Sequence, residues 1–255
     1  MQLAQEIQKR FGAAATRYAQ SDYHGAGPDL AAMLEAAELR GSERVLDVGC
    51  GAGHTALCFA PRVAEVVALD LTEAMLEQAR GLAARRGLAN LRFERGDAHA
   101  LPFEDAAFDV VTCRVCAHHF ARPERAVREV ARVLRPGGRF VLVDSVAPDD
   151  AAQDTFLNAI EWLRDPSHVR NHAVPQWLAW LGAAGLEAAW LHSFRIDLDF
   201  EDWVARIGTP APMVAQLRAL LASAVDEVKS GLGVRSGERA GFEIPIALLV
   251  ARKPA

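Results

Sequence analysis

The chain has 255 residues, of which 51% are hydrophobic and 24% are charged, and its formal net charge is −5. This length and balance are typical of one globular domain with a sizeable core, so we expect residues 1–255 to form a single domain. The acidic balance, without a basic stripe, argues against nucleic acid as a partner. No apolar run approaches the roughly 20 residues of a membrane span, and the first residues lack a signal-peptide pattern, which predicts a cytoplasmic protein.

Strand and helix patterns alternate along the first 150 residues. Helices are predicted over 2–19 and 29–39, ahead of the first strand. Strands are then predicted over 44–48, 64–70, 91–95, 108–114 and 139–145, with helices over 55–60, 72–86 and 123–134 between them. This alternation is typical of an α/β protein with a doubly wound, mostly parallel, Rossmann-like sheet.

From residue 151 the alternation gives way to helices. We predict helices over 151–164 and 175–184, a strand over 186–196, more helices to about residue 229, and a last strand over 244–252, antiparallel in a seven-stranded sheet. The domain then divides into an N-terminal helical lid (1–40), a cofactor-binding half (41–150) and a substrate-side half (151–255). All the tryptophans lie in this last part: Trp162, Trp177, Trp180, Trp190 and Trp203. They fit either core aromatics or the wall of a pocket for an apolar or aromatic substrate.

A glycine-rich loop follows the first predicted strand. Gly49, Gly51 and Gly53 come directly after that strand and directly before a helical pattern. Glycines let the backbone approach a ligand closely, and the start of a helix offers free N–H groups to it. The next strand ends in Asp70, whose carboxylate can accept hydrogen bonds from two ribose hydroxyls. The two features together predict a site for an adenosine-containing cofactor.

The spacing of the loop distinguishes between adenosine cofactors. A dinucleotide fingerprint needs its third glycine where His54 stands, whereas Gly53 comes one residue earlier and Asp47 precedes the loop. A carboxylate there repels a pyrophosphate but suits the ammonium group of an amino acid. This argues against a nicotinamide dehydrogenase. The same loop taken alone also fits a tight turn between a strand and a helix.

With the strand that ends in Asp70, the loop resembles the signature of class I S-adenosylmethionine-dependent methyltransferases. The chain is similar to the ubiquinone and menaquinone biosynthesis C-methyltransferases, which carry a methyltransferase type 11 domain. The matching blocks are residues 45–54, 67–75, 96–103, 113–120, 132–138 and 164–170. The resemblance implies S-adenosylmethionine as cofactor and S-adenosylhomocysteine as product. It transfers no chemical role to blocks 113–120 and 164–170.

The resemblance also implies a set of cofactor-binding residues. Asp47 and the three glycines would surround the methionyl part, and Asp70 would take the ribose hydroxyls. The adenine would lie between apolar side chains and meet a carboxylate, and a backbone carbonyl would accept from the cofactor's ammonium. The residues in these last roles are Leu71 and Met75 beside the adenine, Asp97 and Ala98 at its edge, and Arg114 at the ammonium.

Methyl transfer needs a general base only if the acceptor is a phenol or an acidic carbon. The candidate catalytic residues are His118, His119 and His168, each of which also fits a purely structural imidazole. After the fourth strand there is no Asn/Asp-Pro-Pro-Tyr/Phe element, which argues against adenine or glutamine as acceptor. We expect a small-molecule acceptor, apolar or aromatic and resembling a quinol or phenol, methylated at carbon or oxygen.

Three further expectations complete this interpretation. The segment 11–27, with Tyr18 and His24, is expected to fold over the cofactor as a lid. Cys113 and Cys116 lie near two histidines, but their odd spacing should send the sulfurs to opposite faces, so no metal is expected. The alternative function is a protein of the same fold that binds S-adenosylmethionine without transferring its methyl group.

Overall fold

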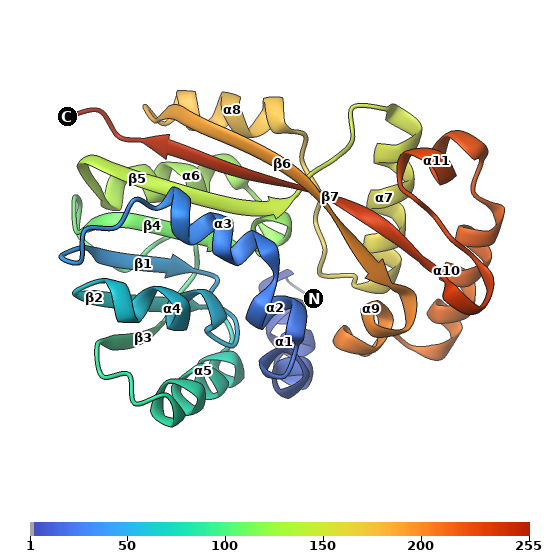
Figure 1. Ribbon diagram of the computed structural model, residues 1–255, viewed down its shortest axis with the longest axis horizontal. Helices are drawn as coiled ribbons and strands as arrows, with labels where there is room; N and C mark the ends of the chain where they lie inside the picture. Colours follow the sequence, from blue (N-terminus) through green and yellow to red (C-terminus); the bar gives the residue numbers. More distant parts are fainter. Residues whose placement is uncertain (1–2) are drawn as a thin grey trace.

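The computed structural model contains a seven-stranded sheet in the order β3-β2-β1-β4-β5-β7-β6 (Figure 1). It describes residues 3–255, except for the side chains of residues 189–191. Strands β1 to β5 are parallel, and β7 runs antiparallel between β5 and β6, which confirms the predicted fold class. The strands are β1 Arg44–Val48, β2 Glu65–Asp70, β3 Leu91–Arg95, β4 Phe108–Arg114, β5 Leu134–Ser145, β6 Glu187–Asp199 and β7 Gly241–Arg252.

Helices connect these strands and follow them in the second half of the chain. The first predicted helix corresponds to α1, and its expected first residue, Gln2, lies outside the described residues. In the first half the helices are α1 Leu3–Ala19, α2 Asp22–Ala26, α3 Pro28–Ala36, α4 His54–Phe59, α5 Glu73–Arg85 and α6 Pro123–Val133. In the second half they are α7 Ala151–Arg164, α8 Val174–Ala183, α9 Phe200–Ile207, α10 Ala211–Ser223 and α11 Asp226–Gly231, and short 3-10 turns are η1 Ala60–Arg62, η2 Ala117–His119 and η3 Gly237–Arg239.

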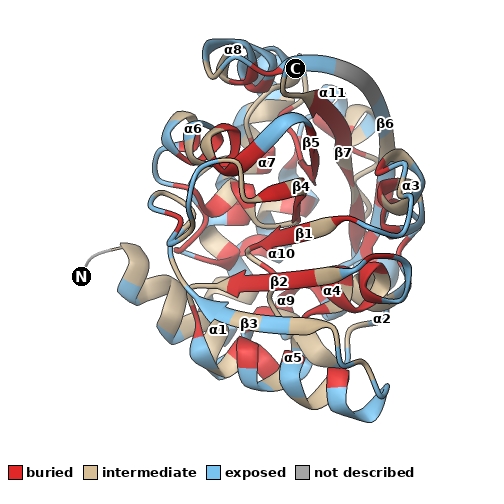
Figure 2. Cartoon of the chain, turned by 90° about the vertical axis from the view of Figure 1, so that its left-hand side faces the viewer, coloured by how far each residue is buried: buried red, intermediate tan, exposed pale blue. Residues whose placement is uncertain are grey.

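Apolar residues cover both faces of the sheet. Along β1, Val45 packs into one core with α3 and α4, while Leu46 packs into a second core with α6 and α8. A strand buried on both faces needs this continuous apolar sequence, which is why the central strands were predictable. Figure 2 shows the central strands buried and the edge strand β3 largely exposed or intermediate. Charged Arg92, Glu94 and Arg95 on β3 discourage pairing with another sheet.

Beyond the carboxyl ends of β1 to β5, β6 and β7 continue into a helical lobe of α7, α9, α10 and α11 (Figure 1). Trp203 on α9 is buried there against Phe242 of β7, with ring centroids 4.9 Å apart. Trp177 of α8 is also buried, so both tryptophans are core aromatics. Trp162 is largely exposed, and the side chain of Trp190 lies outside the described residues. The lobe and the N-terminal helices thus bracket the carboxyl edge of the sheet.

Several boundaries differ from the sequence prediction, most clearly those of α3, β5, β6 and β7. β5 begins at Leu134 because that residue pairs with Phe108 before an irregularity in the register, so the turn that follows is part of an interrupted strand. The separate short helix α2 fell inside a segment predicted only as part of a lid.

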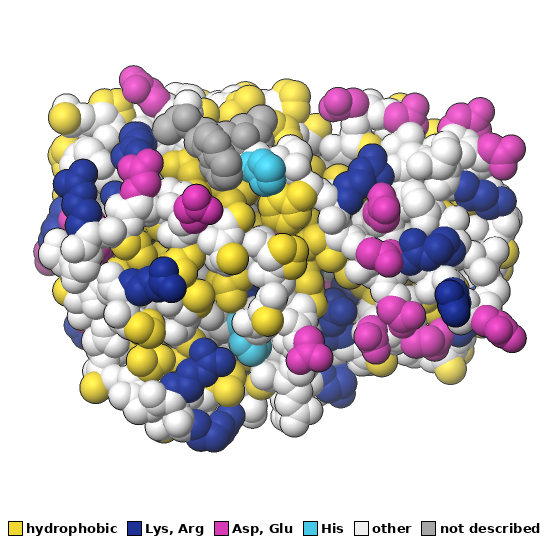
Figure 3. All heavy atoms as spheres, viewed as in Figure 1, with side chains coloured by type: hydrophobic (Ala, Val, Ile, Leu, Met, Phe, Trp, Pro, Cys, Tyr) yellow, Lys and Arg dark blue, Asp and Glu magenta, His cyan; other side chains and the backbone are white. Residues whose placement is uncertain are grey.

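The face drawn in Figure 3 carries acidic and basic side chains intermixed over both the sheet and the lobe. Within residues 3–255, the structure contains no helix with the length and apolar character needed to cross a membrane.

Candidate functional site

A cavity of about 200 Å³ lies at the carboxyl ends of the parallel strands. Its walls are α1, the glycine loop, the ends of β2 and β4, and the segments that follow β3 and β4. In an open α/β sheet this is where ligands bind. The predicted site residues that line it are Gly49, Gly51, Asp70, Leu71, Met75, Asp97, Ala98, Arg114 and His119. The structure places Asp47, Gly53, His118 and His168 behind the walls.

The glycine loop adopts backbone angles that favour glycine. Gly49 and Gly51 have φ values of +66° and +53°. A Cβ at Gly49 would overlap the Cys116 side chain, whereas one at Gly51 would meet no atom within 4 Å. Because Gly51 lines the cavity, a larger side chain there would occupy ligand space.

Asp70 fixes the loop in this conformation. Its carboxylate accepts hydrogen bonds from the backbone N–H groups of Gly51 and Thr72, each at 2.8 Å. Burial raises the pKa of Asp70, and the two N–H donors oppose that rise. The side chain therefore joins the end of β2 to the glycine loop while lining the cavity.

Asp47 lies beneath the loop and is almost fully buried. Its carboxylate accepts from the Thr112 hydroxyl at 2.8 Å and from the Ala56 N–H at 3.1 Å, near the start of α4. Burial raises the pKa of Asp47 to about 7, despite these two hydrogen bonds. The carboxyl thus sits in a position where a nearby cation would favour its ionised form.

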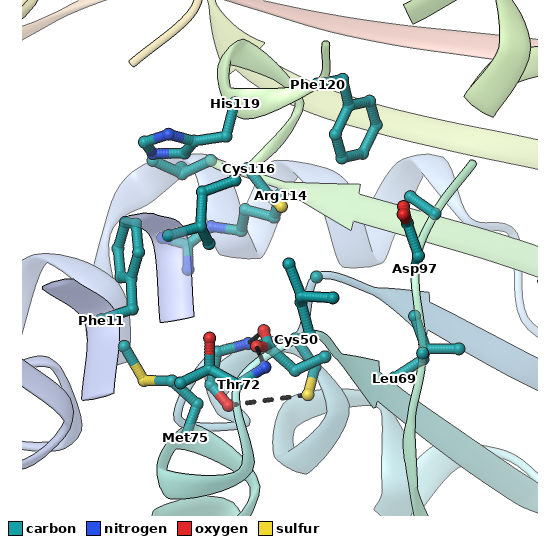
Figure 4. Close-up of a pocket in the computed structure, with 18 of the residues that line it drawn as sticks. Phe11, Cys50, Leu69, Thr72, Met75, Asp97, Arg114, Cys116, His119 and Phe120 are labelled. Atoms are coloured by element: carbon teal, nitrogen blue, oxygen red, sulfur yellow. Dashed lines mark hydrogen bonds between the residues drawn. The ribbon is translucent and has the colours of Figure 1, made fainter. Parts of the chain in front are cut away.

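Asp97 lies at the opposite end of the cavity from His119 (Figure 4). Its Oδ1 atom accepts from the backbone N–H of His99 at 2.9 Å and lies 2.6 Å from the His99 ring nitrogen. Burial raises the pKa of Asp97, but the hydrogen bonds from His99 outweigh it and the pKa is lowered. This end therefore carries an ionised carboxylate, whereas Met75 packs with Phe11 of α1.

His119 is the candidate base that lines the cavity. Its Nδ1 atom lies 2.9 Å from the Ser167 carbonyl oxygen, which can only accept, so Nδ1 carries the proton and Nε2 has a free lone pair. Burial and then the charge of His118 lower the pKa of His119 to about 4. The edge of Phe11 from α1 packs against this imidazole at 5.0 Å between centroids.

His118 and His168 lie behind His119. The ring centroid of His118 is 4.3 Å from that of His119, and its Nδ1 donates to Asp144 at 2.7 Å. His168 is 5.5 Å from His118, and burial together with the other imidazoles lowers the pKa of His168 to about 2. His168 bonds to Asn158 through Nε2 at 3.2 Å.

These contacts give block 164–170 a structural role. The backbone N–H groups of Val169 and Arg170 donate to the His118 carbonyl at 3.0 and 3.1 Å, and the Ser167 carbonyl accepts from His119. Asp165 in turn accepts from the backbone N–H and hydroxyl of Ser167. Block 164–170 therefore holds the turn of block 113–120 that carries the two histidines.

The side chain of Arg114 reaches toward the N-terminal helices. It forms a buried ion pair with Asp29 of α3 and donates to the His24 carbonyl at 2.8 Å. Sequence reasoning considered only the Arg114 backbone carbonyl and missed this contact. The partners are 85 residues apart, so no local pattern connects them.

The N-terminal helix forms one wall of the cavity. Gln8 donates to the Leu71 carbonyl at 3.1 Å, and Phe11 faces His119. Figure 4 shows Phe11 beside His119. The cavity is also lined by residues that were not predicted as site residues: Leu3, Ile7, Cys50, Thr72, Cys116 and Phe120. For Leu3 and Ile7, the apolar periodicity of α1 was the available signal.

The expectation for the two nearby cysteines is wrong in its geometry. The two side chains lie close together rather than pointing to opposite faces, and the neighbouring Cys116 thiol raises the pKa of Cys113. The cause is Val115, whose φ of +50° turns the chain after β4; this is a rare conformation for a β-branched residue. Among the described residues, no group of three or more potential ligands is placed to hold a metal ion.

Comparisons with known proteins agree with this arrangement. A family model described as a methyltransferase domain matches residues 46–142. The chain is 43% identical over 219 residues to an uncharacterized methyltransferase, YcgJ, of Bacillus subtilis, covering 86% of this chain and 87% of that protein. The crystal structure of YcgJ superposes with a TM-score of 0.85 and 41% identity, over 89% of this chain and 98% of that one.

A second relative matches over a shorter stretch. The demethylmenaquinone methyltransferase of Thermus thermophilus is 42% identical over 131 residues, which cover 49% of this chain and 59% of that protein.

Proposed function

This chain belongs to the methyltransferase domain family, and on that premise we propose that it transfers the methyl group of S-adenosylmethionine to a small, uncharged aromatic acceptor of phenol or quinol type. The observation that carries the proposal is the free Nε2 of His119 in a cavity that is also lined by ionised Asp97 and half-buried Asp70. The cofactor supplies an electrophilic methyl group on a sulfonium.

The residues of the cofactor end fit S-adenosylmethionine. Asp70 retains acceptor capacity for ribose hydroxyls beyond its two backbone donors, and Leu71 and Met75 offer apolar surface to a flat base. Asp97 can accept from an exocyclic amine. Asp47 beneath the loop places negative charge near the cationic methionyl part, and the Arg114 backbone carbonyl remains the proposed acceptor for its ammonium.

The acceptor end favours an uncharged substrate. Leu3, Ile7, Phe11 and Phe120 bring apolar surface to the cavity that His119 also lines. Of the charged side chains in the described lining, Asp70 and Asp97 belong to the cofactor end and Arg114 is neutralised by Asp29. These apolar side chains offer no opposite charge to a carboxylate, phosphate or ammonium on the acceptor, and burying such a group unpaired would cost free energy.

In this proposal His119 acts as the general base. The Ser167 carbonyl holds the ring so that Nε2 accepts the acceptor's hydroxyl proton as the new bond to the methyl carbon forms. Phe11 and the other apolar side chains exclude water around the reacting atoms. This favours transfer of the methyl group, because the reacting groups are not surrounded by a hydration shell. His119 releases the proton to water when the site opens.

The test compares His119→Gln with wild-type protein on a series of phenols and quinols, by the release of S-adenosylhomocysteine. We expect kcat to fall by about 10²–10⁴-fold with little change in cofactor affinity, because Gln cannot take the proton. The matched control is His172→Gln, since His172 contacts Trp177 and Trp180 and lies outside the cavity lining.

Two results would contradict the proposal. If His119→Gln stays within a few-fold of wild type, the enzyme uses no base at this position and acts by alignment alone. If wild-type protein binds S-adenosylmethionine but releases no S-adenosylhomocysteine with any acceptor of the series, the phenol or quinol class is wrong.

A further inference from the structure

We infer that His118, held by Asp144, sets the strength of His119 as a base, so that methyl transfer becomes fast only when the His118 imidazole is uncharged. This inference rests on the proposed function and adds a positioning residue to it. In it His118 acts on the reaction only through its neighbour.

Asp144 holds His118 in one orientation at the end of β5. Its carboxylate accepts from the His118 ring Nδ1 at 2.7 Å, from the His118 backbone N–H at 3.0 Å and from the Ser145 N–H at 2.8 Å. Asp144 is almost fully buried, so its charge is little screened by water. A carboxylate that accepts this many bonds stays ionised, and the pKa of Asp144 is lowered although burial opposes this.

His118 and His119 are adjacent in η2, and their rings are tilted by 47° with centroids 4.3 Å apart. A proton arriving on His119 while His118 is charged would put two cations in contact within a buried site. Their repulsion makes His119 a poor base in that state. Once His118 gives its proton to water, the repulsion ends and His119 can accept the acceptor's proton.

Several charged or titratable groups surround His118, and they come from four elements. Asp144 faces it from β5, His119 from its own turn, His168 from the loop after α7, and Glu161 and Arg164 from α7. Burial lowers the pKa of His118, but the charge and hydrogen bond of Asp144 outweigh burial and the net shift is upward. The pKa values of His119 and His168 shift downward, which leaves His118 as the one of these three imidazoles whose pKa is raised.

The decisive measurement is the pH dependence of kcat with both substrates saturating. We expect the wild-type rate to rise with pH through an apparent pKa above the ordinary histidine value of about 6.5. The kcat, rather than kcat/KM, is required because it reports the groups of the bound complex, whereas the raised pKa of Asp47 affects cofactor binding.

Two substitutions separate this coupling from a structural role. Asp144→Asn removes the charge that favours protonated His118, so the apparent pKa should move below about 6.5, the direction that burial alone dictates. His118→Gln removes the titrating ring, so the inflection should disappear. His172→Gln should leave the profile in place. A merely structural role would lower kcat by one factor at every pH and leave the apparent pKa unchanged, which would overturn the inference.

NMR of wild-type protein with labelled histidine gives a second route that needs no variant to fold. We expect the His118 ring to titrate above about 6.5 and the His119 signals to show an inflection at the same pH. Titration of His118 below that value would overturn the inference. The proposed function and this inference fail through different results. If the His119→Gln enzyme stays active, the proposed function is wrong. If His119→Gln is impaired but Asp144→Asn does not shift the pH profile of kcat, only this inference is wrong.

Discussion

The guanidinium of Arg114, at the end of β4, and the carboxylate of Asp29, on α3, form a two-pronged buried ion pair, with Nε to Oδ2 at 2.5 Å and Nη2 to Oδ1 at 3.0 Å. Arg114 also donates to the backbone carbonyls of Tyr23 and His24. The strand that ends at the cavity is thereby fastened to the N-terminal helices. Planar Arg–carboxylate pairs of this kind fix orientation as well as distance.

Loss of Asp29 should therefore destabilise the fold. Asp29→Ala leaves the Arg114 guanidinium buried without a counter-charge, and we expect the free energy of unfolding to fall by about 3–5 kcal/mol. Urea denaturation followed by circular dichroism measures this. Asp22→Ala, an exposed acid on neighbouring α2, is the control and should stay within about 0.5 kcal/mol of wild type. Equal effects of the two variants would remove the ion pair from the stabilising interactions.

Gly51→Val should abolish cofactor binding while the fold survives. The side chain would enter the cavity, and a β-branched residue resists a φ of +53°. Gly87→Val is a matched control because Gly87 has a φ of +64°, meets nothing within 4 Å and lies outside the cavity lining. Calorimetry with S-adenosylmethionine should show binding for Gly87→Val and none for Gly51→Val. Binding by both would mean that the loop is only a turn.

Asp70→Ala should weaken S-adenosylmethionine binding by about 1.5–3 kcal/mol, the range for hydrogen bonds to a charged acceptor. The loop would also lose the anchor of the Gly51 N–H. Isothermal titration calorimetry measures the change, and Asp105→Ala, an exposed acid paired with Arg132, should bind like wild type. An unchanged affinity in Asp70→Ala would place the ribose elsewhere.

The affinity for S-adenosylmethionine should fall as the pH is lowered from about 7 to 5. Burial raises the pKa of Asp47 to about 7, so the unliganded protein carries a neutral carboxyl below that pH, whereas the cationic ligand favours the carboxylate. At the limit of full coupling, the affinity falls about tenfold per pH unit. Calorimetry at pH 7 in two buffers of different ionisation enthalpy should detect proton release on binding.

The pH dependence of the free energy of unfolding provides an independent check on the raised pKa of Asp47. A carboxyl whose pKa is raised by folding keeps its proton in the native state where the unfolded chain has lost it, so unliganded stability should decline as the pH rises from about 4 to 7. Asp47→Asn should flatten both dependences. A pH-independent affinity in wild-type protein would separate Asp47 from the cofactor's charge.

Local patterns were sufficient for the sheet. The strands over 91–95 and 108–114 have the predicted bounds, because apolar runs flanked by turn residues leave few alternatives. Gly49, Gly51 and Asp70 also line one cavity together, since a motif of fixed spacing determines its own local geometry.

Contacts between residues far apart in the chain could not be predicted from the sequence. His118 and His119 are neighbours in the chain, and only the packing of residues 164–170 against their turn decides which ring meets the cavity. The burial of Asp47 beneath the loop likewise follows from Thr112 on a different strand. Side-chain direction at a strand end depends on such partners, and Val115 reverses the expected direction for Cys116.

Helix α1 contacts the cavity walls twice within a single turn. Gln8 is bonded to the Leu71 carbonyl, and Phe11, three residues later on the same helical face, packs on His119. Because both contacts belong to one rigid helix, they would be made and broken together. Opening of this wall would then require α1 to move as a unit, and the frequency with which α1 lifts would set an upper bound on turnover.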